Sequence, residues 1–235
     1  MTLYDDLSGP TLRDDRWQFL QVPIDETRTW TYTEPEAKTD VSDGTVSVRI
    51  DEFTRSHSQV QILDNPKHLL VSIEEFDLTK GTRTFSVDMA AENIGADGED
   101  YRDGFAAFNV LDMTTADVFD LIATSRHAYA IHERLYVPGV IDKTDAFTHV
   151  IHTPLTAPRI APSTNHHYAI TIDRDHGTIT WSIDDTSIYT AHSSTVPTSV
   201  RIGFGIITLH PIDNGASTSL RGQGLRANWT TFDIT

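Results

Sequence analysis

Alternation of apolar and polar residues with a period of two runs through almost the whole chain. The segment GTITWSIDD, residues 177–185, shows this pattern, and no window of a dozen residues carries the i, i+3, i+4, i+7 apolar stripe of a helix. Segments of this kind bury one face each as β-strands. We expect about eleven strands, at 44–50, 56–63, 82–92, 104–112, 117–125, 128–137, 146–153, 166–174, 177–185, 199–210 and 226–235.

The chain of 235 residues shows no repeat, linker or low-complexity tract. All-β sandwiches and barrels often reach this length without dividing, so residues 1–235 are expected to form a single β-sandwich domain.

The net charge and the amino-acid usage narrow the range of partners. There are 34 acidic against 18 basic residues, a formal net charge of −16, and no cysteine. Such a surface repels phosphate backbones and anionic lipid, which argues against nucleic acid and membrane as partners. The absence of cysteine excludes disulfides and thiol chemistry. The start MTLYDDLSGP lacks the features of a signal peptide, so a cytoplasmic location is the expectation.

Three stretches carry a resemblance to a known fold: YDDLSGPTLRDDRWQFL near the start, the hairpin HHYAITIDRDHGTITWSIDDTSIYT, and VRIGFGIITLHPI after it. They resemble concanavalin A-like sandwiches, the jelly roll of legume lectins and many glucanases. VFDLIATSRHAYAIHERL with GFGIITL further resembles an uncharacterised bacterial and fungal family of this fold. The resemblance implies two antiparallel sheets. The glucanase motif Glu-x-Asp-x-x-Glu is missing, and only Asp120 stands in its place.

The stretch DLIATSRHAYAIHERL, residues 120–135, predicts a hairpin whose loop is Ser125 to His127. With three loop residues, Asp120 faces His132 and Val118 faces Arg134 across the two strands. A carboxylate beside an imidazole suits acid–base catalysis, with Arg134 as a ligand contact. The alternative is a solvated polar pair.

A second polar face is expected on residues 55–62, where Arg55, His57, Gln59 and Gln61 alternate with smaller or apolar side chains. Planar donors of this kind orient an oxygen-rich ligand, so His57 becomes a further catalytic candidate and the other three become ligand contacts. The alternative is that this face is the solvated outside of the sandwich.

The four tryptophans divide into two groups. We expect Trp17, Trp181 and Trp229 in the core, and Trp30, in the polar segment TRTWTYTEPE, against a ligand. His210, at the end of a predicted strand, is a further ligand-contact candidate.

The acidic chain ends suggest a structural calcium site. If the first and last strands are neighbours, Asp6 and Asp233 can supply oxygen ligands to calcium. Solvated termini are the alternative. No glycine-rich phosphate loop is present, because GFG at 203–205 lies inside a strand and favours close approach of backbone or ligand, so no cofactor is expected.

These observations support two functions. The first is an enzyme without a cofactor that acts on an oxygenated, partly apolar small molecule by cyclisation, isomerisation or hydrolysis. The second is a carbohydrate-active protein, either a glycosidase or a lectin-like glycan binder. A glycosidase needs two carboxyl groups, and Asp88 and Glu92 are the best partners for Asp120 on sequence grounds. A purely structural or partner-binding sandwich is a third reading, and the oligomeric state is left open.

Overall fold

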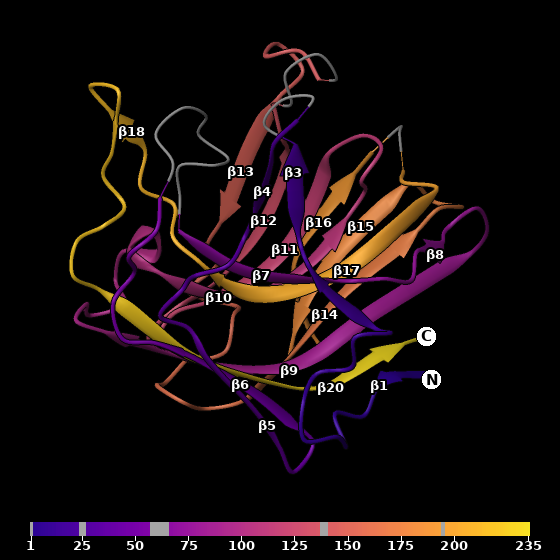
Figure 1. Ribbon diagram of the computed structural model, residues 1–235. Coiled ribbons are helices and arrows are strands. Elements are labelled where there is room, and N and C mark those ends of the chain that lie inside the picture. Colours follow the sequence, from indigo (N-terminus) through magenta and orange to yellow (C-terminus); the bar gives the residue numbers. More distant parts are fainter. Residues whose placement is uncertain (1, 24–26, 57–65, 137–140, 194–195) are drawn as a thin grey trace.

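The computed structural model describes residues 2–23, 27–56, 66–136, 141–193 and 196–235. They form two large antiparallel sheets (Figure 1). The back sheet has the order β16 (Thr186–His192), β15 (Thr178–Ile183), β14 (His166–Asp173), β9 (Thr82–Ile94), β20 (Gly224–Ile234), β6 (Thr45–Ile50) and β5 (Lys38–Ser42), with β1 (Thr2–Asp5) beside β20. The cleft sheet has the order β13 (Phe147–Ile151), β12 (Ala128–Arg134), β11 (Asp117–Ala123), β10 (Phe105–Leu111), β17 (Ser199–Ile207), β7 (Lys67–Ser72) and β2 (Trp17–Phe19), with β8 (Phe76–Asp77) beside β17.

Two small hairpins, β3 (Gln21–Pro23) with β4 (Thr29–Thr31) and β18 (Ile212–Asp213) with β19 (Ala216–Ser217), complete the strands. The described residues contain one helical element, the 3-10 turn η1 (Tyr101–Asp103). No helix among them has the length and apolar character needed to cross a membrane. The two-sheet all-β prediction is confirmed; the predicted strand 56–63 lies almost entirely outside the described residues.

The core lies between the two sheets and is filled by the inward half of each alternating pattern. Phe85, Val87 and Met89 of β9 face Phe119 and Leu121 of β11 within one buried cluster. Trp17, Trp181 and Trp229 are also buried there, as predicted. The indole N–H of Trp229 donates to the carbonyl of Ala107 at 3.1 Å, which satisfies its polar atom inside the core.

Two glycines of β17 let neighbouring strands approach closely. A Cβ built on Gly205 would lie 2.1 Å from the carbonyl oxygen of His68, and one on Gly203 would lie 2.9 Å from that of Leu70. Both carbonyls belong to β7, the neighbour of β17. The GFG segment therefore admits backbone, as the sequence suggested.

A buried histidine gives the fold a specific sensitivity to acid. His68 is 5% exposed, and its Nδ1 accepts from the backbone N–H of Glu34 at 3.3 Å. Burial lowers the pKa of His68 to about 4, with Glu34 partly opposing the effect. The unfolded chain titrates near 6.5, so it binds more protons than the folded protein between pH 6.5 and 4.

We expect His68 to remove stability as the pH falls through this interval, by about 3 kcal/mol in full. Urea unfolding at pH 7 and pH 4 measures the loss. In His68→Gln the difference between the two pH values should shrink by that amount, whereas His192→Gln, at an exposed position, should leave it unchanged. Equal losses in the wild type and His68→Gln would contradict the prediction.

Candidate functional site

A cleft of about 460 Å³ lies on the outer face of the cleft sheet, the face turned away from the back sheet. Residues of six neighbouring strands, β13, β12, β11, β10, β17 and β7, form its floor. Its walls are formed by η1, by the segments that follow β2, β4, β12 and β17, and by Ala146 before β13. Its lining comprises Leu20, Tyr32, Lys67, Leu69, Tyr101, Phe105, Asn109, Leu111, Val118, Asp120, Ile131, Glu133, Arg134, Leu135, Tyr136, Ala146, Phe147, Thr148, Val150, Ile207 and Leu209. The volume suits a small ligand, for which pockets of about 300–1,000 Å³ are usual.

Asp120 lies at the floor of this cleft. It is 5% exposed, and its Oδ1 accepts from Nδ2 of Asn109, directly opposite on β10, at 2.6 Å. Burial raises the pKa of Asp120 well above its ordinary value, and Glu133 raises it further; Asn109 and Lys67 oppose the shift. Asp120 is therefore a carboxyl group that holds its proton unusually tightly.

Glu133 is a second carboxyl group in the same cleft. Its Oε2 accepts from the hydroxyl of Thr148 on β13 at 3.0 Å, and it is half-buried. Burial raises the pKa of Glu133, while Thr148 and Lys67 oppose the shift. In β11 and β12 Asp120 pairs with Ile131 and Val118 pairs with Glu133, so the two carboxyl groups occupy diagonal positions on one face. The backbone positions of diagonal neighbours in a sheet lie roughly 7–8 Å apart.

The sequence-predicted pairing of Asp120 with His132 is wrong. The hairpin loop holds four residues, 124–127, because Thr124 closes the turn: its N–H donates to the carbonyl of His127, and its hydroxyl accepts from the N–H of His127. This register places His132 on the opposite face, half-buried against Phe119 and Trp181 at the edge of the core. Burial lowers the pKa of His132, the reverse of what a carboxylate partner does.

A carboxyl pair in an apolar cleft can divide the roles of acid and base. Two such groups resist simultaneous ionisation, so the more deeply buried Asp120 retains a proton while Glu133 ionises first. The protonated group can donate to a leaving oxygen and the ionised group can activate water. Acid–base chemistry is thus available without His132.

The buried carboxyl group should cost stability at neutral pH. The pKa of Asp120 is higher in the folded protein than the value near 3.9 in an unfolded chain. Asp120 therefore costs no stability below about pH 4, and its cost grows as the pH rises above that value. We expect Asp120→Asn, which still accepts from Asn109, to raise the free energy of unfolding by about 1–3 kcal/mol at pH 7.5. Chemical unfolding should show this gain vanishing near pH 4; a loss of stability at pH 7.5 would contradict it.

Arg134 lies at one end of the cleft with its charge already paired. Its Nε and Nη2 donate to the two oxygens of buried Asp117, both at 2.9 Å. Asp117, not the predicted Val118, is its partner across the strands. The role of Arg134 as a ligand contact stays a prediction. The bidentate bond to Asp117 already uses Nε and Nη2 of the guanidinium.

Trp30 is half-buried and packs against the apolar side chains beneath the cleft, outside the inter-sheet core. The guanidinium of Arg55 lies 4.1 Å above its ring, and Arg55 Nη1 also donates to the carbonyls of Thr31 and Thr33. Trp30 and Arg55 thus come together on the cleft side, and their ligand roles stay predictions. The other members of that predicted polar face, His57, Gln59 and Gln61, lie outside the described residues.

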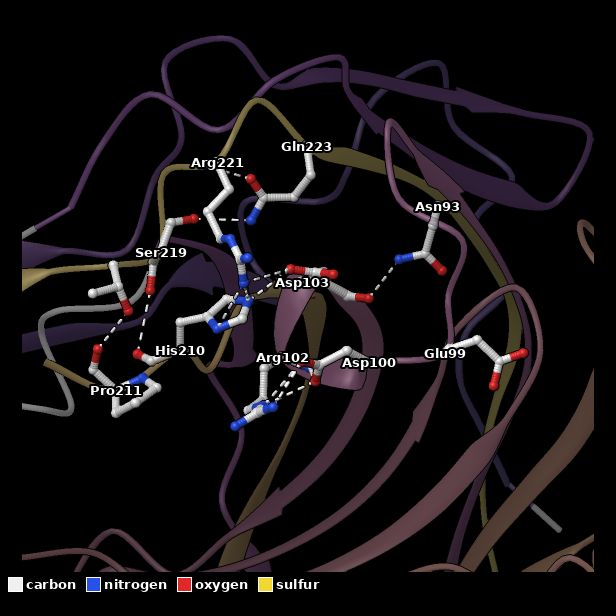
Figure 2. Close-up of polar contacts among 12 residues, drawn as sticks. Asn93, Glu99, Asp100, Arg102, Asp103, His210, Pro211, Ser219, Arg221 and Gln223 are labelled. Atoms are coloured by element: carbon white, nitrogen blue, oxygen red, sulfur yellow. Dashed lines mark hydrogen bonds and ion pairs between the residues drawn. The ribbon is translucent and has the colours of Figure 1, made fainter. Parts of the chain in front are cut away.

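His210 is buried, and Figure 2 shows the polar network that it joins. Its Nε2 lies 2.6 Å from Oδ1 of Asp103 in η1, and the guanidinium of Arg221 lies 3.0 Å from the same nitrogen. The neighbouring Leu209 donates its N–H to the carbonyl of Arg102. His210 therefore fastens the segment after β17 to η1, and both border the cleft through Leu209 and Tyr101. Its predicted ligand contact stays untested.

Within the described ranges, one group of side chains has the spacing of metal ligands: Asp100, Asp103 and His210, whose ligand atoms all lie within 4.8 Å of one another. Two arginines already serve this group, because Arg102 binds Asp100 and Arg221 reaches Asp103 (Figure 2). The guanidinium groups of these two arginines therefore already pair with the two carboxylates.

The chain ends meet as predicted, with β1 beside β20 and Leu3 opposite Asp233. Asp6 is exposed and accepts from the N–H of Ser8, whereas Asp233 is buried. Neither belongs to the metal-spaced group found among the described residues. A calcium site at Asp6 and Asp233 stays a prediction.

Asp88 and Glu92 cannot be the partners of Asp120. They lie on β9 of the back sheet, where Asp88 contacts His167 Nδ1 at 2.8 Å and Glu92 accepts from Ser163 at 2.6 Å. The carboxyl partner on the cleft side is Glu133. In the sequence, Glu133 is the single carboxylate on an alternating face whose other members, Tyr129, Ile131 and Leu135, are mainly apolar.

Comparison with protein-family models assigns this sequence to a family. The model of a "Family of unknown function (DUF6081)" matches residues 4–235. The chain belongs to this family. A search of the curated proteins found no match to this sequence.

Solved structures share the fold of this DUF6081 protein. A glycoside hydrolase family 16 endo-glucanase from Bacteroides ovatus aligns over 98% of both chains with a TM-score of 0.60 and 12% identity. The β-glucanase of Bacillus licheniformis has a TM-score of 0.55 and 14% identity, covering 96% of this chain and 94% of that one. LamA from Zobellia galactanivorans, in complex with laminaritriose and laminaritetraose, has a TM-score of 0.57 and 13% identity over 97% of each chain. At these identities the likeness establishes the jelly-roll fold alone.

Proposed function

We propose that this protein is carbohydrate-active: it binds a saccharide in the cleft and hydrolyses a glycosidic bond with Asp120 and Glu133. The observation that carries the proposal is the pair of carboxyl groups on one face of the cleft sheet, both with raised pKa values. Glucanases of the same fold, one of them in complex with laminaritriose and laminaritetraose, add support.

The arrangement differs from the glucanase motif, in which carboxylates follow one another on a single strand. On β11 the residues flanking Asp120 on the cleft side are Val118 and Ile122, and the second carboxyl group comes from the adjacent strand β12. In the hydrolysis that we propose, the two carboxyl groups therefore come from two neighbouring strands.

In the proposed reaction, Asp120 donates its proton to the glycosidic oxygen as the bond between that oxygen and the anomeric carbon breaks. Glu133 takes a proton from water, whose oxygen forms the new bond to the anomeric carbon. A single displacement of this kind, in which one carboxyl group protonates the leaving oxygen and the other activates water, inverts the anomeric configuration. Inversion is the expected stereochemistry.

The test is release of reducing ends from mixed-linkage β-glucan, laminari-oligosaccharides and alkyl and 4-nitrophenyl β-glucosides. Wild type is compared with the double variant Asp120→Asn/Glu133→Gln and with Asp88→Asn/Glu92→Gln, a matched pair on the back sheet. We expect release by the wild type and the back-sheet variant only, with NMR showing the inverted anomer first. The proposal would be overturned if the wild type neither bound any of these saccharides nor released reducing ends from them.

A further inference from the structure

The walls of the cleft are mostly hydrocarbon. Of its 21 lining residues, six carry amide, hydroxyl, carboxyl or basic groups other than a phenol. Five of those six already form hydrogen bonds within the protein: Asn109 donates to Asp120, Thr148 donates to Glu133, and Arg134 donates to Asp117. A run of sugar units would bring many hydroxyl groups into this space, and each buried hydroxyl needs a hydrogen-bonding partner.

Most of the apolar residues of this lining belong to one packed cluster. Leu69, Phe105, Ile131 and Ile207 form a buried cluster on this side of the cleft sheet, with Tyr32 beside them. This cluster is separate from the core between the sheets. It gives the cleft a firm apolar floor next to the two carboxyl groups, because Ile131 lies between Glu133 and Tyr129 on the same alternating face of β12.

We propose that the cleft takes a glycoside with an apolar aglycone, in which one sugar unit lies at Asp120 and Glu133 and a hydrocarbon group lies against the aliphatic wall. This inference rests on the proposed function and names the substrate class of the same site. The polar groups gather around the carboxyl pair, where the one sugar unit would lie, while residues such as Leu20, Val150 and Leu209 match an alkyl, terpenoid or other hydrocarbon moiety.

The test uses n-alkyl β-D-glucosides with methyl, butyl and octyl chains, kept below their micellar concentrations. Binding is measured by calorimetry on Asp120→Asn/Glu133→Gln, which prevents turnover. Each buried methylene adds up to about fourfold in affinity, so we expect the octyl glucoside to bind at least about 100-fold more tightly than the methyl glucoside. Octanol, which lacks the sugar, should bind at least about tenfold more weakly than octyl glucoside.

A variant of the wall supplies the control. Leu209→Ser should weaken octyl glucoside binding about tenfold and leave methyl glucoside unchanged, because Leu209 lines the cleft beyond the end of β17, away from Asp120 and its partner Asn109. Leu155→Ser, at a residue that is 98% exposed, should change neither.

The outcomes separate the two proposals. Equal affinity across the alkyl series, with release of reducing ends from glucan, would overturn the apolar-aglycone proposal and leave the hydrolase standing. Octanol binding as tightly as octyl glucoside, with no saccharide bound, would overturn both.

Discussion

Replacement of Asp120 by asparagine is expected to slow hydrolysis of an alkyl β-glucoside by at least about 100-fold, the usual range for loss of a general acid. Hydrolysis of 4-nitrophenyl β-glucoside by the same variant should fall much less, because nitrophenolate leaves without being protonated. The ratio of kcat/KM between the two substrates measures the split. A purely structural role for Asp120 would lower both rates together.

Glu133→Gln provides the complementary control. Because the water must be activated whatever the leaving group, this variant should lose at least about 100-fold on both substrates. The back-sheet variant Glu92→Gln should lose activity on neither. If Glu133→Gln showed the leaving-group dependence expected of Asp120→Asn, the two roles would be assigned the wrong way round.

Gly205→Ala is expected to lower the free energy of unfolding by about 3 kcal/mol or more. The added methyl group would lie 2.1 Å from the carbonyl oxygen of His68 and 2.8 Å from Cα of Leu69, both backbone atoms of β7. Rotamer changes cannot relieve such a contact, so β17 and β7 must separate inside the cleft sheet. Urea unfolding monitored by tryptophan fluorescence measures the loss.

Two further glycines calibrate this result. Gly203→Ala meets the carbonyl oxygen of Leu70 at 2.9 Å and should cost less than Gly205→Ala. Gly9→Ala meets no backbone atom closer than 3.3 Å and should cost little. A wild-type stability for Gly205→Ala would contradict the close strand approach seen here.

Much of the fold was predictable because the core accepts one face of every strand. Alternation located β9, β14 and β15 to within about two residues of their observed ends, and it identified the buried residues Trp181 and Trp229. Short strands such as β3 and β4 escape this pattern, since three residues do not establish a period.

The candidate site was predictable only in part, for a reason that lies in β11 and β12. The sequence indicates the correct core face of β11, with Phe119 and Leu121 inward. On β12, however, both faces are apolar: Ala128 and Ala130 face the core, and Tyr129 and Ile131 face the cleft. Segregation of apolar residues therefore could not decide the register, and the choice of a three-residue loop placed His132 rather than Glu133 beside Asp120.

Two of the last strands along the chain occupy interior positions in the two sheets. β17 separates β10 from β7, and β20 separates β9 from β6 (Figure 1). During translation, the first five strands of the two sheets to leave the ribosome are β1, β2, β5, β6 and β7. They lack the neighbours that join them to the rest of each sheet until synthesis is almost complete. The nascent polypeptide must keep these unpaired edges from associating with other chains until β17 and β20 arrive, so its need for chaperones should be concentrated in that interval.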